Sequence, residues 1–244
     1  MHILHFPELD STNNYLLSHL HEYEDEDVVA VADSQTHGRG SGTNSWESED
    51  GKNLTFSILI HPCDISPSRQ FIISMAVSIA IRNVIADIIP DGDLCKIKWP
   101  NDIYVGDKKI CGILIENSLQ GGVLRNCVLG IGLNVNQTLF TSDAPNPISL
   151  KQITGKEHDR DKILNNILTA FEEVLNGKDF VQECPKIYHS DLYRADGHFY
   201  DFCDSGGLFK AKIDHVEESG HIILHDLLGN IRTYAFKEVQ FVIG

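Results

Sequence analysis

The sequence predicts an α+β protein in which a mixed β-sheet packs against helices and a small all-β unit follows at the C-terminal end. Three observations predict this class: apolar runs with strand spacing, two long segments with helical spacing, and a tail of short alternating strands divided by glycine-containing turns. After "YRADG" the pattern changes from mixed helices and strands to short alternating strands alone, so we expect one domain at residues 1–195 and a second at 196–244. An apolar fraction of 42% is ordinary for a globular chain with a filled core.

The first ninety residues are expected to alternate strands with helices. Ser11 or Thr12 can cap a helix in "DSTNNYLLSHL". Ser66-Pro67 can open a much longer helix, and Pro90 lies beyond its end. Strands are expected at residues 2–6, 28–34 and 54–61.

Two tight turns organise the strands that follow. Gly106-Asp107 and Gly121-Gly122 separate the apolar runs "IYV", "KKICGILIE" and "LRNCVLGIGLNVN", and such turns join β-hairpins. The sheet should therefore be mixed or antiparallel. A second helix should run from its N-cap Asp159 to Asn176, with Gly177 beyond it. The tail, with "LFKAKIDHV", "HIILHD", "IRTYAF" and "VQFVI", is typical of a small β-barrel of about 45 residues.

Composition argues against several classes of function. A formal net charge of −15 disfavours a nucleic-acid surface, which needs a basic patch to replace phosphate counterions. The six cysteines form no CxxC pair and no zinc-type spacing, and no signal peptide is recognisable. The apolar segment 71–89 is interrupted by serines and charged residues, so it should be an amphipathic helix and not a membrane span. We therefore expect a cytoplasmic protein that binds neither DNA nor a membrane.

The polar loop "GRGSGTNSW", residues 38–46, combines three glycines with Arg39. Such a loop can wrap an anion, because free backbone N–H groups and a guanidinium both bind oxygen atoms. A flexible surface loop is the alternative. Neither usual nucleotide-binding loop is present: no GxGxxG opens a helix here, and "GK" at 51–52 is followed by Asn53 where a Walker loop has Ser or Thr.

The stretch "KIKWPNDIYVGDKKICGILIE" carries a second group of candidates. Asn101 and Asp102 lie at a turn between two strands, where an amide and a carboxylate can hold Mg²⁺ together with water. An ordinary Asx turn explains the same pair. Lys109 begins an apolar strand, and its ammonium either points into a cleft or is solvated at the edge.

In "GIGLNVN", residues 130–136, two glycines interrupt an apolar strand. Glycine weakens a strand and commonly marks the close approach of a ligand or of another backbone. Asn134 and Asn136 follow where the strand should end. We therefore expect a close approach over this strand.

Together these segments resemble the biotin protein ligase family. The motifs "STNN", "QTHGRG", the isolated Trp46, "KWPND", "KKICGILIE" and "GIGLNVN" occur in the order and approximate spacing of that family. The resemblance implies a catalytic domain of the class II synthetase-like biotin/lipoate ligase type. It also implies that the β-rich tail is an SH3-like C-terminal domain.

Members of this family activate biotin with ATP to biotinyl-5′-adenylate and then acylate one lysine of a biotin carboxyl carrier domain. The resemblance implies this reaction here, with Mg²⁺ at the phosphates. It implies catalytic roles for Lys109 and Arg39, because both can stabilise negative charge at the carboxylate and the α-phosphate. Biotin would contact Ser11, Thr12, Asn13, Gln35, Gly38, Arg39, Trp46, Lys109 and Gly112. The adenylate would contact Arg39, Trp46, Asn101, Lys109 and Asn134, and Mg²⁺ would contact Asp102 and Asn101.

Two departures from the family pattern refine this expectation. Members that also repress transcription carry an N-terminal winged helix-turn-helix domain, whereas "STNN" starts here at residue 11, so we expect a ligase without that domain. Ser41, Gly42 and Asn44 stand where bacterial members commonly have arginines. We therefore expect the adenylate to be released faster than from an arginine-rich relative.

The sequence leaves open two rival functions and the possibility of a homodimer. A lipoate–protein ligase shares the fold and the chemistry, but it would carry a different signature in place of "KWPND". A catalytically silent binding or scaffold protein is the second rival, and the presence of Arg39, Asp102 and Lys109 argues against it. An unpaired strand edge could pair two copies into a homodimer, as in some relatives.

Overall fold

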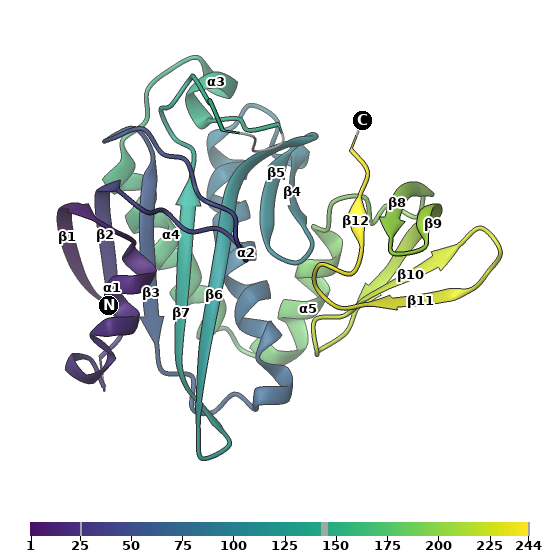
Figure 1. Cartoon of the computed structure of the whole chain (residues 1–244), viewed down its shortest axis with the longest axis horizontal. Coiled ribbons are helices and arrows are strands. Elements are labelled where there is room, and N and C mark those ends of the chain that lie inside the picture. The colour runs from purple at the N-terminus through teal and green to yellow at the C-terminus, as the bar shows by residue number, and fades with distance from the viewer. Residues whose placement is uncertain (25, 143–145, 244) are drawn as a thin grey trace.

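The computed structural model describes residues 1–24, 26–142 and 146–243. Its centre is a seven-stranded sheet with the order β1-β2-β3-β7-β6-β5-β4 (Figure 1). Only the β1–β2 pair is parallel among these neighbours, which confirms the predicted mixed sheet. The strands are β1 (His2–Leu9), β2 (Val28–Gln35), β3 (Leu54–Ile60), β4 (Cys95–Lys98), β5 (Asp102–Val105), β6 (Lys108–Gln120) and β7 (Val123–Leu133).

Helices cover the two faces of this sheet unequally. One face packs on α2 (Phe71–Ile88), α4 (Arg160–Leu175) and α5 (Phe180–Ser190), where the main core lies. The other face carries α1 (Thr12–Ser18), whose Leu16 packs with Val28, Leu59 and Val128 in a smaller cluster. Successive strand residues point to opposite faces, so every second residue of β6 and β7 faces the α1 side. The short helix α1 does not cover all of these residues.

Helix α2 is more deeply buried than its sequence suggested. The segment Pro67–Ile88 is long and apolar enough to cross a membrane, but 67% of the relevant window is buried inside this fold. Ser74 and Ser78, which we expected on a polar face, are buried as well, and the Ser78 hydroxyl donates to the Ser74 carbonyl at 2.7 Å. The expectation that these two serines mark a polar, exposed face was wrong. A serine can be buried in a helix because its hydroxyl can donate to a carbonyl of the preceding turn.

The helix after Asp159 was predicted correctly, whereas two other helices were not. Asp159 caps α4 by accepting a hydrogen bond from the Lys162 backbone at 3.0 Å. The unexpected helices are the five-residue α3 (Leu150–Thr154) and α5, which contains Pro185. A proline normally breaks a helix, but burial of Cys184 and Tyr188 holds α5 on the core.

The tail forms a second sheet of five antiparallel strands in the order β11-β10-β9-β8-β12. This confirms the all-β tail, although the first strand was not anticipated. The strands are β8 (Tyr200–Asp204), β9 (Gly207–Val216), β10 (Ile222–Asp226), β11 (Ile231–Tyr234) and β12 (Gln240–Phe241). Apolar residues of this sheet, such as Phe202 and Leu224, join the same continuous core as the large sheet. A domain boundary at residues 195/196 therefore stays a prediction.

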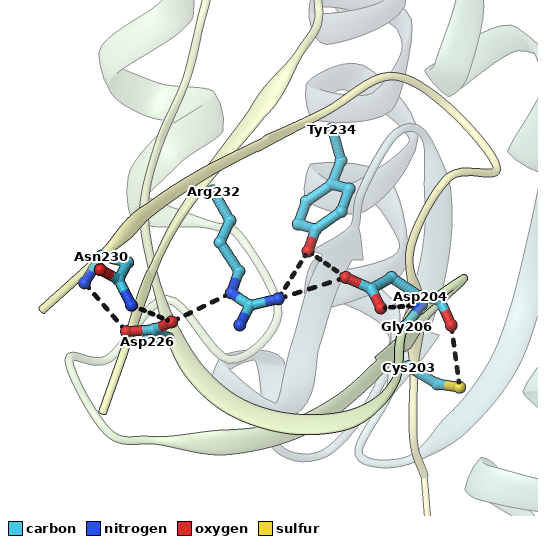
Figure 2. A network of polar contacts seen from close by, with 7 residues as sticks. All are labelled: Cys203, Asp204, Gly206, Asp226, Asn230, Arg232 and Tyr234. Atoms are coloured by element: carbon cyan, nitrogen blue, oxygen red, sulfur yellow. Dashed lines mark hydrogen bonds and ion pairs between the residues drawn. The ribbon is translucent and has the colours of Figure 1, made fainter. Parts of the chain in front are cut away.

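A network of charged side chains braces the second sheet (Figure 2). The buried Asp226 carboxylate accepts from the backbone of Leu228 and Asn230 at 2.9 Å each and from Arg232 Nε at 3.1 Å. Arg232 also reaches Asp204 at 3.3 Å. The β10–β11 turn is thus held by Asp226, and the strand after it is tied to β8.

Candidate functional site

Three glycines of β6 and β7 open a shallow hollow on the α1 side of the sheet. The register pairs Gly112 with Gly132, and Leu114 with Gly130. A Cβ at Gly130 would collide with the Asn13 amide, and one at Gly132 or Gly112 would collide with the Trp46 indole. The expected close approach over "GIGLNVN" is therefore real, and its partners are side chains of α1 and of the β2–β3 loop.

At one end of the hollow, hydroxyl and amide groups form a closed cluster. Gln35 Oε1 accepts from the Thr12 backbone N–H at 2.8 Å and lies 3.2 Å from the Thr12 hydroxyl. The Ser57 hydroxyl lies 2.7 Å from Thr12 Oγ1 and 2.6 Å from Asn13 Oδ1. Thr12, Asn13 and Ser57 are each at most 3% exposed. We call these four side chains the amide cluster.

The structure adds two members to this end that the sequence analysis missed. Ser57 is one, and Glu116 is the other. Glu116 accepts a two-pronged ion pair from Arg39, with N–O distances of 2.9 and 3.1 Å, and a hydrogen bond from Asn13 Nδ2 at 2.9 Å. Both follow strand alternation, which places them opposite the core; that alternation was the available signal.

The loop of residues 38–46 is a small hairpin of its own. The Trp46 backbone N–H donates to the Gly38 carbonyl at 2.9 Å, and Gly40 donates to the Asn44 carbonyl at 2.8 Å. A Cβ at Gly38 would strike the Trp46 carbonyl, and Gly42 has a φ of 70°, so glycine is needed at both places. Figure 1 shows this connection between β2 and β3 crossing over the middle of the large sheet.

Trp46 closes the loop over the hollow. Its indole rests on the two glycines Gly112 and Gly132, and the Lys109 ammonium lies 5.8 Å from the ring centroid. The indole N–H is buried and has no hydrogen-bond partner in the described structure. Burying such a donor costs about 1–3 kcal/mol, so an unmet donor in a hollow indicates a missing acceptor.

At the other end of the hollow, Lys109 and Asp102 form an ion pair with an N–O distance of 2.7 Å. Antiparallel pairing of β5 with β6, with an irregularity between Ile103 and Tyr104, brings the two side chains together. Each is about a quarter exposed. Of the two alternatives for Lys109, the structure supports the partly enclosed position; it is not a freely solvated edge lysine.

Asn134 is the second unsatisfied group of this end. It is 3% exposed and donates from Nδ2 to the Ile148 carbonyl at 3.1 Å, while its Oδ1 has no partner in the described structure. The described residues have four such buried, unpartnered side-chain atoms, and two of them belong to Trp46 and Asn134. Two of these four therefore fall on residues that the sequence assigned to the adenylate.

The turn that carries Asn101 and Asp102 is anchored from behind. It follows a cis Trp99–Pro100 bond, and the Tyr188 hydroxyl donates to the Pro100 carbonyl at 2.6 Å. Within the described part of the chain, no group of three or more His, Cys, Asp and Glu side chains could hold a metal ion. The pair of Asn101 and Asp102 as magnesium ligands, with further oxygen atoms from phosphate or water, therefore stays a prediction.

The sequence-predicted residues thus fall into two groups. Thr12, Asn13, Gln35 and Arg39 meet at the amide cluster, and Ser11 starts α1 beside it, its carbonyl accepting from Tyr15. Gly112, Trp46, Lys109 and Asp102 meet at the other end. The structure does not bring Arg39 to Lys109, because Arg39 is held by Glu116, seven residues further along β6. Joint action of Arg39 and Lys109 on one carboxylate stays a prediction.

Two cavities of the structure lie away from this hollow. One of about 440 Å³ lies between α2, α5 and β9, lined in part by Ile72 and Val216. Another of about 640 Å³ lies near the N-terminus beside His61. The Trp46 indole lies in the hollow of β6 and β7, directly against Gly112 and Gly132.

Comparison with known proteins decides the family. The sequence matches the Biotin/lipoate A/B protein ligase family over residues 5–134, more than half of the chain. The chain belongs to this family. The match runs from before "STNN" to Asn134, so the amide cluster, the loop and the Lys109–Asp102 pair all lie within the matched residues.

Two relatives show how much of the chain is similar to known members of the family. The bifunctional ligase/repressor BirA of Bacillus subtilis is 32% identical over 177 residues, which cover 70% of this chain and 53% of that protein. The biotin–[acetyl-CoA-carboxylase] ligase of Mycobacterium tuberculosis is 32% identical over 66% of this chain and 59% of its own length. The chain thus matches little more than half the length of these curated relatives.

A solved structure matches the whole chain. Biotin protein ligase from Aquifex aeolicus, in complex with biotin and ATP, superposes with a TM-score of 0.78 at 25% identity and covers 99% of both chains. This likeness confirms the predicted fold class, including the β-rich tail, over both sheets.

Proposed function

We propose that this protein is a biotin protein ligase that forms biotinyl-5′-adenylate from biotin and ATP and then biotinylates one lysine of a biotin carboxyl carrier domain. The observation that carries the proposal is the pair of unmet polar atoms, Trp46 Nε1 and Asn134 Oδ1, beside the Lys109–Asp102 ion pair. They lie on a hollow whose other end is lined with hydroxyls and amides. A ligand with a polar head, an acyl chain and a nucleotide matches that distribution.

The amide cluster suits the ureido ring of biotin. A buried urea has one acceptor and two donors that all need partners, and Thr12, Asn13, Gln35 and Ser57 present both kinds of group. Binding would exchange the present bonds inside the cluster for bonds to the ring. The ion pair of Arg39 and Glu116 borders this end of the hollow.

The chemistry belongs to the Lys109 end. An oxygen of the biotin carboxylate attacks the α-phosphorus of ATP, and pyrophosphate leaves with the electrons of the broken P–O bond. Lys109 would stabilise the negative charge that builds up there, once phosphate competes for its ammonium with Asp102. Mg²⁺, held by Asp102 and Asn101, would neutralise part of the phosphate charge.

Transfer to the carrier completes the cycle. The ε-amine of a carrier lysine attacks the acyl carbon of the adenylate, the amide forms, AMP leaves and the amine loses a proton. Trp46, which now fills the hollow, would move aside for the ligand and then shelter the reactive anhydride from water. Asn134 Oδ1 would accept from the exocyclic amine of adenine.

The partner, location and assembly belong to the same proposal. We place the protein in the cytoplasm with a carboxylase carrier domain as its partner and without a role in binding DNA. Strand β1 forms an edge of the large sheet along which two copies would pair, whereas the outer edge of β4 is already bonded through Ile97 to Asp191 and Tyr193. Light scattering of the purified protein with and without biotin and ATP measures this assembly.

One experiment separates the ligase from its rivals. The protein is incubated with ATP, Mg²⁺ and a carrier domain, together with either biotin or lipoate, and the carrier is weighed by mass spectrometry. Addition of biotin alone to one lysine supports the proposal. Addition of lipoate would make it a lipoate ligase, and no addition with either acid would make it a silent member of the family.

A further inference from the structure

A single carboxylate joins the amide cluster to the loop of residues 38–46. Glu116 Oε1 accepts from Arg39 Nη2 at 2.9 Å, and Glu116 Oε2 accepts from Arg39 Nη1 at 3.1 Å. The same Oε2 also accepts from Asn13 Nδ2 at 2.9 Å. Glu116, on β6, therefore contacts one side chain of α1 and one side chain of the loop at the same time.

The amide of Asn13 has a donor side and an acceptor side, and its neighbours decide which way it faces. A carboxylate only accepts hydrogen bonds, so the amide must turn its Nδ2 toward Glu116. Nδ2 also lies 3.4 Å from the Leu114 carbonyl, a second group that only accepts. Asn13 Oδ1 is thereby directed over Gly130 at the floor of the hollow.

The fixed amide in turn fixes a hydroxyl. The Ser57 hydroxyl has one hydrogen, and it lies 2.6 Å from Asn13 Oδ1, which can only accept. Ser57 and Asn13 are 0% and 3% exposed, so their polar atoms bond to each other and not to bulk solvent. Glu116 thus sets the direction of two hydrogen bonds in this region, although it is not itself a member of the amide cluster.

This direction matters for a ligand that carries N–H groups. The ureido ring of biotin has two N–H donors, and each needs an acceptor when it is buried. In the observed orientation, Asn13 offers an oxygen to such a donor. In the reversed orientation, the NH₂ group of Asn13 would meet the N–H of the ligand, and a buried donor without an acceptor weakens binding.

We propose that Glu116 is a positioning residue for the acid substrate: it fixes the direction of the Asn13 amide, so that the amide cluster presents an oxygen acceptor to the ureido N–H groups. This inference rests on the proposed function for the identity of the ligand. Glu116 acts through Asn13 and takes no proton or bond in the reaction. Its ion pair with Arg39 holds the carboxylate in place.

An exchange of the two groups tests the direction. Glu116→Gln replaces the carboxylate by an amide of the same shape, which presents either an oxygen or an NH₂ group, so the Asn13 amide is free to reverse. Asn13→Asp alone places two carboxylates against each other. In the double variant Asn13→Asp/Glu116→Gln, the amide at position 116 donates to the carboxylate at position 13, whose other oxygen again faces Ser57 and the hollow.

Glu218→Gln is the matched control. Glu218 accepts a two-pronged pair from Arg69, with N–O distances of 2.9 and 2.6 Å, the same kind of pair that Glu116 makes with Arg39. Glu218 lies between β9 and β10 and lines the cavity beside α2 and α5, away from the hollow. The control therefore removes an ion pair of the same type and leaves Asn13 untouched.

Thermal unfolding without any ligand measures the coupling between positions 13 and 116. We expect Asn13→Asp to lower Tm, because it buries two like charges side by side. The double variant should melt at a higher temperature than Asn13→Asp, because it restores one donor between the two positions. Effects on Tm that are simply additive would show that Asn13 does not take its direction from Glu116, and would overturn the inference.

Titration calorimetry with biotin alone measures the consequence for the ligand. We expect Glu116→Gln to weaken the dissociation constant about tenfold, while the double variant and Glu218→Gln stay within about threefold of the wild type. In biotin-dependent ATP–pyrophosphate exchange, Glu116→Gln should raise KM for biotin about as much and leave kcat and KM for ATP unchanged. A purely structural role of Glu116 would not be repaired by the second substitution at position 13.

Two further results would contradict the inference: wild-type affinity for biotin in Glu116→Gln, or a double variant that binds biotin no better than Glu116→Gln. Failure of the proposed function gives a different pattern. In that case the wild type binds no biotin, while the Tm values still show the coupling between positions 13 and 116.

Discussion

The two ends of the glycine-lined hollow are built in opposite ways. At the amide cluster, Thr12, Asn13, Gln35 and Ser57 satisfy one another within a rigid frame of sheet and helix. At the Lys109 end, which we propose as the nucleotide end, polar atoms of Trp46 and Asn134 are buried without partners among the described residues, and the charged side chains of Lys109 and Asp102 are partly exposed. The hydrogen bonds of the first end are made within the protein itself, and we propose that those of the second end are completed by the ligand.

The difference follows from where the residues come from. The amide cluster is drawn from α1, β2 and β3, which pack on a buried core. The nucleotide end depends on the loop that carries Trp46 and on the turn that carries Asp102. When a ligand replaces one hydrogen bond of a satisfied group by another, the binding free energy gains little, since each such bond is worth about 0.5–1.5 kcal/mol net. A ligand that bonds to a buried atom without a partner also removes the penalty of about 1–3 kcal/mol for leaving that atom unsatisfied.

Removing the central charge of the nucleotide end should have the largest effect. Lys109→Ala should fold normally, because the side chain is a quarter exposed, and lose about 10²–10³ in the rate of biotin-dependent ATP–pyrophosphate exchange. Lys108→Ala, at the exposed neighbouring position, is the control and should keep the wild-type rate. Near-native exchange by Lys109→Ala would remove Lys109 from the reaction.

A pair of glycine substitutions separates the two ends directly. Gly130→Ala would push against the buried Asn13, which cannot move easily, so it should lower Tm and weaken biotin binding about tenfold or more. Gly132→Ala would push against Trp46, which sits on a loop and can yield. Titration calorimetry with biotin should therefore show a larger loss for Gly130→Ala; equal losses would contradict a rigid and an adaptable end.

Adding charge to the loop should have a moderate effect. Ser41→Arg gives the loop a second guanidinium, and we expect the adenylate to dissociate about tenfold more slowly, as one charge-assisted hydrogen bond is gained. Stopped-flow fluorescence measures the release, and untargeted acylation of exposed lysines should fall in parallel. An unchanged release rate would show that backbone contacts or Trp46 retain the adenylate.

The smallest expected effect concerns the network of Asp226 and Arg232 that braces the second sheet, away from both ends of the hollow. The side-chain hydrogen bond from Asn230, together with backbone donors and Arg232, lowers the pKa of Asp226 to about 2. A carboxyl whose pKa is lowered by folding stabilises the fold above its unfolded pKa of about 4, and this contribution is lost as pH falls toward 2. Asp226→Asn should thus lower Tm by a few degrees at pH 7, and the difference from wild type should shrink in acid. A difference that is constant with pH would assign the effect to packing.

Much of the fold and part of the site were predictable from local patterns. The motif order predicted the ligase fold, and Gly106-Asp107 and Gly121-Gly122 predicted hairpins because tight turns need few residues. Helix α5 was missed because Pro185 is a local helix breaker that only tertiary packing overrides. Glu116 was missed for another reason: strand alternation places it on the α1 side of the sheet, but no local spacing reveals that its partner there is Arg39, 77 residues earlier.

The indole N–H groups offer the most direct measurement of the contrast between the two ends. The protein has two tryptophans: the Trp99 indole donates to the Gly220 carbonyl at 2.9 Å, whereas the Trp46 indole has no partner among the residues that the structure describes. In a sample with ¹⁵N-labelled tryptophan, two indole resonances report the two sites, and Trp46→Phe assigns them. Our account predicts that biotin with ATP and Mg²⁺ shifts the Trp46 resonance strongly and leaves that of Trp99 nearly in place. A Trp46 resonance that stays fixed while adenylate accumulates would contradict the claim that ligand completes this end of the hollow.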